Sequence, residues 1–561
     1  MTTKLRKFFK IPASAKKKTL YLITATGITG LTFESVAAAS STNPNFAPLS
    51  NDIGEKVRFG FDGIFRSSRA IYTISSNVVD YKYSLRGLEL DSNEFYTKLS
   101  EVHLRSAKRL LKLCETNKGF YVKAGQFVAA MRQVPTEYSS TLASLQDKAV
   151  PYHFKAVKEV LVRNLGQDLS DLFLSFDEKP IAAASIAQVH RAMLKDHQEV
   201  AIKVQYPGLE KQMKIDITTM AFLSNATAWI FPEYRFEWMV SEFERSISRE
   251  LDFIQEAKNS ERTAKNFRKN NIVRVPRVNW ELTTNQVLTM QFCSGHKIDD
   301  VGYLKEAGIN PTKVAKALME VFAEMVFVHG FVHGDPHPGN ILVAPEGRNG
   351  FSLVLLDHGI YKELDEGFRL DYCQMWNALI LLDSKKIQFL GERFGVGKYS
   401  RYFPVIFTGR TIDSKSALGR GMSDEEKKNL KLEVKSLKME DFSAFMESLP
   451  SDFLTILRTD GLLKSITSKL GAPQQVRLLA YAKYSIYGLS AKSNAESDST
   501  VGHVLYRFKT AVTYVRFRLF LESVELFSEM KDLQQFVAKK LKQMLFAAVH
   551  LLIIPFSLIR S

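Results

Sequence analysis

The sequence predicts an α+β fold, and three observations support this prediction. Apolar residues recur at helical spacing from about 93 to 165. Residues 180–206 change to short apolar runs that end in the alternating segment 199–205, which is typical of a strand. Helical periodicity returns after 365. The 561 residues, 45% hydrophobic and 24% charged, exclude disordered and fibrous classes and allow two to four domains or one large two-lobed unit.

The formal net charge of +16 is concentrated at the N-terminus. Residues 1–40 contain seven Lys or Arg and one acid, Glu34, so this segment carries +6 and the rest of the chain is only mildly basic. No zinc-finger, homeodomain or RNP-type pattern occurs, and aromatic residues are not interleaved with basic ones. The sequence therefore predicts no nucleic-acid partner.

The three cysteines, Cys114, Cys293 and Cys373, are scattered, and no pair has CxxC spacing. They are too few for a disulfide framework. We expect all three to be small buried hydrophobic residues.

Residues 1–40 have the character of a targeting segment. The first 33 residues lack acids and combine Lys and Arg with Phe, Leu, Ser and Thr, which favours a mitochondrial transit peptide. A secretory signal is the competing interpretation, but the apolar stretch Thr19–Phe33 is diluted by five Thr and two Gly. This stretch is shorter than the ~20 apolar residues that cross a bilayer. A membrane anchor that continues to Ala39 remains an open alternative.

The C-terminal segment 501–561 is basic and apolar. Within it, Met544–Ile559 is an apolar run interrupted by His550, Pro555 and Ser557, with three lysines shortly before it. Two interpretations remain open: a final helix docked on the fold, or an interfacial helix whose cationic flank holds anionic lipid.

The middle of the chain contains shorter signals. Residues 41–92 predict a linker followed by a first helix, because their start is rich in Asn, Pro, Ser and Gly. The runs 272–278, 280–282 and 287–292 are expected to be strands of one antiparallel sheet. The Lys-rich stretch 411–440 is expected to be a surface insertion.

The segment that carries the clearest chemistry runs from His333 to Asn340 and is followed by Asp357. Asp335 and Asn340 lie five residues apart on one loop, and Asp357 comes at the end of the next predicted strand. Carboxylate and amide oxygens are hard ligands that suit Mg²⁺ together with phosphate oxygens, as in kinase-like folds. Asp335 then remains free to orient or deprotonate an attacking hydroxyl.

Two other interpretations of this loop compete with the Mg²⁺ site. Histidines four apart, such as His333 and His337, bind zinc when they lie on a helix, but Pro336 and Pro338 exclude a helix here. The other is a polar turn in which Asp and Asn act only as caps. The Asp-x-Gly at 357–359 favours the Mg²⁺ interpretation over both.

Lys203 lies in the middle of a predicted strand, between Ile202 and Val204. An isolated buried ammonium is costly, so it requires anionic partners. Nucleotide phosphates and the carboxylate of Glu256 are the candidates. A phosphate-covering loop before this strand would ordinarily be glycine-rich, but here it consists of Ala182, Ala183, Ala184 and Ser185. Their Cβ atoms restrict the backbone φ angles, so we expect this loop to bind phosphate differently from a glycine-rich one.

With these residues in place, the chain resembles the UbiB family of atypical protein-kinase-like proteins, also called the ADCK or aarF-domain group, in its mitochondrial branch. The resemblance covers about residues 90–490 and rests on motifs that occur in the family's order. They are the KxGQ signature at Lys123 to Gln126, the alanine-rich loop, Lys203, the ExD signature at Glu250 to Asp252, Glu256, Asp335 with Asn340, and Asp357.

The resemblance implies a two-lobed protein-kinase-like fold. An N-terminal helical extension would lay Lys123 and Gln126 against the site, where they meet Glu250 and Asp252 and block a protein substrate. The hinge would fall at Gln291, Phe292 and Cys293, after the gatekeeper Met290. The implied divisions are 1–40 targeting, 41–92 linker and first helix, 93–178 helical extension, 179–294 N-lobe, 295–500 C-lobe and 501–561 C-terminal helices.

The resemblance also implies activity and partners. The cofactors would be ATP or ADP with Mg²⁺, the client a ubiquinone or other lipid, and the location the inner mitochondrial membrane or its surface. An ATPase or small-molecule kinase is the leading hypothesis. A pseudokinase-like module that binds nucleotide without phosphoryl transfer is the alternative, and a protein kinase acting in trans ranks last because of the Lys123 segment.

Overall fold

The computed structural model describes most of the chain between residues 52 and 495. The described residues are 52–89, 92–130, 134–146, 151–230, 237–347, 350–411, 422–436, 448–495 and 512, 515, 516 and 519. The predictions for residues 1–40 and for Met544–Ile559 lie outside them.

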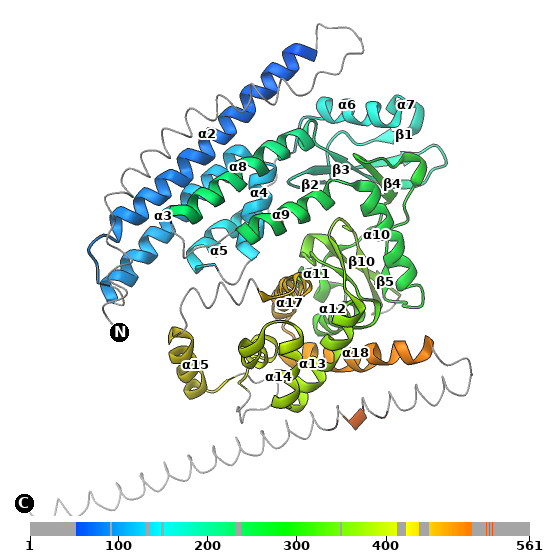
Figure 1. The fold of residues 1–561 in the computed structure, drawn as a ribbon. Coiled ribbons are helices and arrows are strands. Elements are labelled where there is room, and N and C mark those ends of the chain that lie inside the picture. Colours follow the sequence, from blue (N-terminus) through cyan, green and yellow to red (C-terminus); the bar gives the residue numbers. More distant parts are fainter. Residues whose placement is uncertain are drawn as a thin grey trace, which may run out of the picture. The chain divides into compact units, whose positions relative to one another are not determined.

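The chain divides into two compact units, and both mix helix with sheet, as predicted (Figure 1). The first unit holds the described residues up to Lys297 together with Asp335–Glu346 and Phe351–Tyr361. The second holds Ile298–Gly334, Gly347–Gly350 and the described residues from Lys362 onward. Every candidate site residue therefore belongs to the first unit.

The first unit begins with helices that pack around one apolar core. They are α2 (Asp52–Ser84), α3 (Asn93–Asn117), α4 (Phe120–Ala130), α5 (Thr136–Leu142), the 3₁₀ helix η2 (Ala143–Gln146), α8 (Leu209–Ile230) and α9 (Glu237–Glu250). The Ser92 hydroxyl caps α3 by accepting from the Phe95 N–H. The core contains Leu113, Phe120 and Ile247, all nearly inaccessible.

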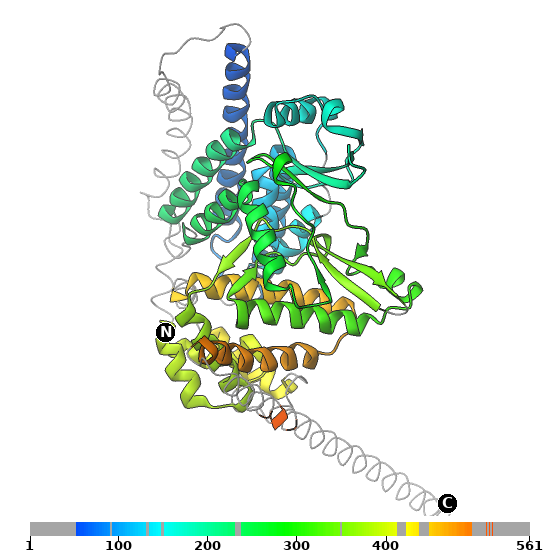
Figure 2. The same cartoon turned by 90° about the vertical axis from the view of Figure 1, so that its right-hand side faces the viewer.

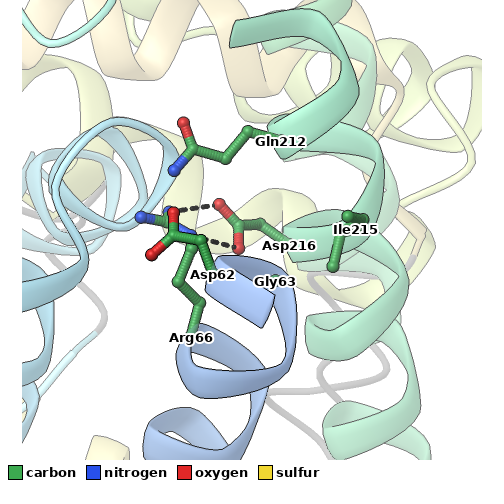
Figure 3. Close-up of a pocket in the computed structure, with 6 residues that line it drawn as sticks. All are labelled: Asp62, Gly63, Arg66, Gln212, Ile215 and Asp216. Carbon is green, nitrogen blue, oxygen red and sulfur yellow. Dashed lines mark hydrogen bonds and ion pairs between the residues drawn. The ribbon is translucent and has the colours of Figure 1, made fainter. Parts of the chain in front are cut away.

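A buried ion pair joins α2 to α8 (Figure 3). The Arg66 guanidinium donates to both carboxylate oxygens of Asp216, with Nε 3.1 Å from Oδ1, and also to the Asn117 carbonyl at the end of α3. Burial raises the pKa of Asp216 to about 6, although the charge of Arg66 opposes this shift. The pair lies on the helices that support α4.

A five-stranded sheet follows, with the order β1-β3-β4-β6 and β2 paired to β3. The strands are β1 (Phe173–Phe176), β2 (Ala182–Ala183), β3 (Ala187–Leu194), β4 (Glu199–Gln205) and β6 (Val287–Gln291). Helix α6 (Phe154–Leu165) packs Val157 and Leu161 against Ile202 and Val204 of β4, with the short α7 (Leu169–Leu172) beside β1. Helix α10 (Phe253–Asn266) packs near β6.

Two sequence predictions in this region are wrong. The strand β1 lies inside 93–178, which was predicted to be helical. The run 280–282 forms the 3₁₀ helix η3 (Trp280–Leu282), since the Asn279 side chain accepts from the Leu282 N–H. The first and third runs pair mainly with other strands: β5 (Val273–Arg274) pairs in parallel with β10 (Gly350–Leu355), and β6 pairs with β4. Only the end of the first run meets β6 as predicted, through the antiparallel bridge between Val278 and Met290. Alternation shows that a run is extended and says nothing of its partner.

The second sheet has the order β5-β10-β9-β7, where β9 is Ile341–Glu346 and β7 is His296–Lys297. β9 follows the Asp335 loop and its 3₁₀ turn η5 (Pro338–Asn340), and β10 leads into Asp357. The sheet thereby sets the positions of both acidic segments.

The second unit is mainly helical. Its elements are α11 (Val301–Glu306), α12 (Pro311–Glu324), the π-helix η4 (Met325–His329), β8 (Phe331–His333), α13 (Glu366–Leu381), α14 (Ser384–Arg393), η6 (Gly397–Tyr402), η7 (Pro404–Thr408), α15 (Asp424–Ser436), α17 (Ser451–Lys469) and α18 (Gln474–Ala495). The strand β11 (Tyr361–Glu363) begins with the last residue of the first unit and continues into the second. Helix α18 packs along α12 and α13 (Figure 2). Aromatic side chains fill the core, with Trp376 and Tyr481 centroids 4.8 Å apart.

Among the helices that the structure describes, none combines the length and hydropathy that a membrane span requires. All three cysteines are free thiols. Cys114 and Cys373 are buried as expected, but Cys293 is half-buried, which corrects the prediction for that residue. It follows a strand end, where the chain leaves the sheet.

Candidate active site

Lys203 lies on β4, inside the five-stranded sheet, and is 8% exposed. Its Nζ lies 2.7 Å from Glu256 Oε1 and 2.9 Å from Oε2, so it bridges both carboxylate oxygens. The same Nζ lies 3.1 Å from Asp357 Oδ2. The structure therefore gives the buried ammonium the partner that the sequence predicted, Glu256, and adds the carboxylate of Asp357.

Helix α10 places Glu256 because of its cap. The Asp252 carboxylate accepts from the N–H groups of Ile254 and Gln255, which starts the helix. Glu256 then falls in the first turn, where the helix dipole favours a negative charge. Its side chain is 1% exposed and faces Lys203.

Burial and charge act in opposite directions on these groups. Burial disfavours the charged form of Lys203, but the carboxylates of Asp357 and Glu256 outweigh it and raise the lysine pKa. Burial would raise the pKa of Asp357, yet Lys203 and the Gly359 N–H hold it well below its usual range. Burial raises the pKa of Glu256 to about 7, against the attraction of Lys203. Asp357 is therefore an anion at neutral pH.

The loop from Asp335 to Asn340 is held by its own backbone. The Asn340 Nδ2 donates to the Asp335 carbonyl at 3.1 Å, and the His337 N–H donates to the same oxygen at 2.7 Å. The Leu356 N–H donates to the Asn340 carbonyl at 3.0 Å. This last bond ties the Asn340 backbone to the residue that precedes Asp357.

The donor set fits Mg²⁺ rather than zinc. Among the described residues, no group of three His, Cys, Asp or Glu side chains forms a complete metal site. His337 Nδ1 accepts from the Gly339 N–H, within the loop's own turn. Asn340 and Asp357 supply two hard oxygen ligands, and Mg²⁺ completes such a set with phosphate oxygens and water. A bound nucleotide is what this site would need.

The glycine after Asp357 shows how closely the acids approach. A Cβ at Gly359 would lie 3.2 Å from Asp357 Oδ1, 3.6 Å from Glu256 Oε2 and 3.7 Å from Glu250 Cγ. Three carboxylate side chains thus surround one backbone position. A side chain at 359 would compete with them for space.

The KxGQ and ExD residues meet only in part. Lys123 Nζ on α4 lies 2.9 Å from Glu250 Oε2, and burial raises the pKa of Glu250 although Lys123 opposes it. Gln126 instead donates to the Leu145 carbonyl at 3.0 Å, and Asp252 caps α10. The expectation that both pairs meet at the site therefore holds for Lys123 and Glu250 and is wrong for Gln126 and Asp252.

The alanine-rich loop and the hinge lie at the ends of strands. Ala182 and Ala183 form β2, and the Ala184 N–H donates to the Ala187 carbonyl at 2.8 Å, with Ser185 in the turn between. Met290 is buried on β6, and its neighbour Gln291 donates its N–H to the Arg277 carbonyl. Burial raises the pKa of the Cys293 thiol. Their contacts with a nucleotide stay predictions.

Sequence reasoning missed the groups that hold Asp357 in place. No sequence motif indicates a role for Asn259, His358 or Tyr361. All three residues are buried. Asn259 Nδ2 donates to the His358 carbonyl, and His358 Nδ1 is hydrogen-bonded to the Tyr361 hydroxyl. The available signal was the spacing of Asn259, three residues after Glu256, which puts both on one face of a helix.

The strand lysine paired with a helix carboxylate, together with the Asp-Asn loop and the Asp-x-Gly segment, defines a kinase-like protein. In agreement, residues 144–390 match the ABC1 atypical kinase-like domain. The chain is 37% identical to AarF domain-containing protein kinase 1 of Xenopus laevis, over 79% of this chain and 86% of that protein. It is 39% identical to the Mus musculus protein of that name, over 73% of this chain and 78% of that protein.

A third relative, a probable serine/threonine-protein kinase of Dictyostelium discoideum, is 36% identical over 83% of this chain and 66% of its own length. The chain belongs to the AarF-domain, or UbiB, family of atypical kinase-like proteins. The family resemblance identified from the sequence motifs is confirmed.

Proposed function

We propose that this protein binds ATP or ADP with Mg²⁺ and acts as an ATPase or small-molecule kinase in ubiquinone or lipid homeostasis. The observation that carries the nucleotide part is the contact of the buried Lys203 with the buried Glu256 and the partly exposed Asp357. The lysine contacts both carboxylates within 3.1 Å, so the cation and the metal-binding acid are already assembled. The lipid part follows from the family alone.

The residues divide the work of phosphoryl transfer among them. Lys203, oriented by Glu256, holds the α- and β-phosphates. Asn340 and Asp357 hold Mg²⁺, which neutralises charge on the phosphates. Asp335 accepts the proton of the attacking hydroxyl or water. The pair of Lys123 and Glu250 occupies the neighbouring space and disfavours a protein substrate.

The first test is the melting temperature of the protein with ATP or ADP, with and without Mg²⁺. Ligand at about 100 times its Kd stabilises a fold by about 2.7 kcal/mol. We expect a Mg²⁺-dependent shift in the wild type and its loss in Asp357→Asn, since the amide is a weaker metal ligand. If the variant shows the full Mg²⁺-dependent shift in melting temperature, Asp357 is not a metal ligand.

The pseudokinase-like alternative keeps the nucleotide site and omits phosphoryl transfer. It is favoured by the ion pair in which Lys123 Nζ lies 2.9 Å from Glu250 Oε2. Phosphate release decides between the two: a binding module releases no more phosphate than Asp335→Ala does. Turnover well above that control establishes an enzyme.

We also propose that the protein acts at the inner mitochondrial membrane. The support is the acid-free, basic N-terminal segment together with the family resemblance. Residues 1–40 fused to a fluorescent protein should be imported into mitochondria, and replacing Lys16, Lys17 and Lys18 by Glu should abolish import. Secretion of the fusion would favour the signal-peptide interpretation.

A further inference from the structure

The segment after Asp357 is tied to α10 by buried polar groups on one face of that helix. Glu256 Oε1 accepts from the His358 N–H at 3.4 Å, and Asn259 Nδ2 donates to the His358 carbonyl at 3.0 Å. Glu256 and Asn259 lie three residues apart, so both project from one face of α10 and hold the His358 backbone from that face.

The His358 ring is anchored at both nitrogens and is 2% exposed. Nε2 lies 3.0 Å from the Leu355 carbonyl, and Nδ1 lies 3.0 Å from the Tyr361 hydroxyl. A carbonyl only accepts, so Nε2 donates to the Leu355 carbonyl, and Nδ1 shares a hydrogen bond with the Tyr361 hydroxyl. The ring therefore spans from the end of β10 to the start of β11.

These bonds hold Asp357 from both sides. Leu355 lies two residues before it, and the Gly359 N–H donates to its Oδ1 at 2.9 Å. Its Oδ2 faces Lys203, whose other partner, Glu256, belongs to α10. Helix α10 thus contacts Asp357 through Lys203 and contacts the segment that carries it through His358.

We propose that His358 is a positioning residue: its ring bonds to Leu355 and Tyr361 fix the segment that carries the Asp357 carboxylate, and its backbone bonds to Glu256 and Asn259 lock that segment to α10. The lysine-glutamate pair and the metal ligand then assemble or disassemble together. This inference rests on the proposed nucleotide function for its purpose, but the lock itself consists of hydrogen bonds within the protein. A phenylalanine at 358 would fill the same space and make neither ring hydrogen bond.

Hydrogen exchange of the ligand-free full chain tests the lock directly. In His358→Phe we expect exchange to accelerate at least 10-fold in two regions at once, 355–363 and 253–266. The matched control is Tyr481→Phe, which removes another buried tyrosine hydroxyl bond, to Asp460 Oδ1 at 3.2 Å in the second unit. It should leave both regions unchanged. Acceleration of 355–363 alone would overturn the coupling to α10.

A second comparison separates hydrogen bonding from packing. His358→Asn keeps an acceptor near the Nδ1 position but leaves more empty volume than His358→Phe. If the ring acts by its hydrogen bonds, hydrogen exchange in 355–363 and 253–266 should be slower in His358→Asn than in His358→Phe. If it only fills space, Phe should be the better substitute, and the proposal fails.

The Mg²⁺ dependence links the lock to the site. We expect His358→Phe and Tyr361→Phe to raise the Mg²⁺ concentration for half-maximal ATP-induced stabilisation about 10-fold, with metal-free ATP affinity within twofold of wild type. If the variants lose ATP affinity equally with and without Mg²⁺, the positioning role is overturned. If wild-type protein binds no nucleotide, the proposed function fails, while the exchange experiment still decides whether the lock exists.

Discussion

At the residue scale, the cost of burying charge explains the site. Lys203 requires anionic partners because its ammonium is almost inaccessible, and Glu256 and Asp357 meet that requirement. Glu256 was predictable, since a carboxylate on a following helix is the natural partner of a strand lysine. Asp357 was predicted as a metal ligand, and its contact with Lys203 required the folded chain.

His190 gives a pH prediction. It is fully buried on β3, where Nδ1–H donates to the Asp177 carbonyl at 2.7 Å and Nε2 accepts from Gln188 at 2.9 Å. Burial lowers its pKa, so the folded protein keeps it neutral. The unfolded chain takes up the proton as pH falls below about 6.5, and stability is lost in that range.

The measurement is urea unfolding at pH 7.5 and 5.5. From pH 7.5 to 5.5, the free energy of unfolding of the wild type should fall by about 1 kcal/mol more than that of His190→Asn. Asparagine keeps a donor for the Asp177 carbonyl and does not titrate. Equal losses in the two proteins would show that His190 is protonated in the fold.

At the element scale, glycines mark where helices touch. In α4, a Cβ at Gly125 would lie 2.4 Å from Leu145 Cδ1 and 3.1 Å from Cys114 Sγ. Both neighbours are buried, so the glycine of the KxGQ segment is required by close packing of α4 on η2 and α3. The motif thus has a packing component beside its Lys123 ion pair.

Gly488 on α18 gives the sharper prediction. A Cβ there would lie 2.1 Å from the Phe327 carbonyl oxygen and 2.8 Å from Cys373 Sγ, so backbone must move. Gly488→Ala should therefore destabilise the second unit by about 3 kcal/mol. Alanine normally stabilises a helix relative to glycine, by up to about 1 kcal/mol. Gly302→Ala on α11, where a Cβ would make only an ordinary contact at 3.5 Å, should instead stabilise the protein. Urea unfolding of both variants measures the two changes in the free energy of unfolding.

At the scale of the whole molecule, the candidate site draws on segments far apart in sequence that belong to one unit. The first unit combines residues before Lys297 with Asp335–Glu346 and Phe351–Tyr361. Nucleotide should therefore stabilise that unit selectively. The second unit contains no candidate site residue.

Calorimetry checks this division. A chain of two compact units is not expected to unfold in one two-state step. Mg²⁺ with ATP should raise the melting temperature of the first unit, and Gly488→Ala should lower the melting temperature of the second. A single transition that responds equally to ligand and to Gly488→Ala would contradict independent unfolding of the units.

The sequence by itself determined the α+β class, the helical periodicity of the extension and the C-terminal half, and the family, because periodicity and motif order are local properties. It also identified Lys203, Glu256, Asp335, Asn340 and Asp357. Strand partners were predicted correctly only at the bridge between Val278 and Met290, since alternation carries no information about which edge a strand joins. Only the tertiary structure placed Gln126 on Leu145 and locked His358 to α10. Such contacts depend on which faces meet across long sequence separations, and no local pattern records that.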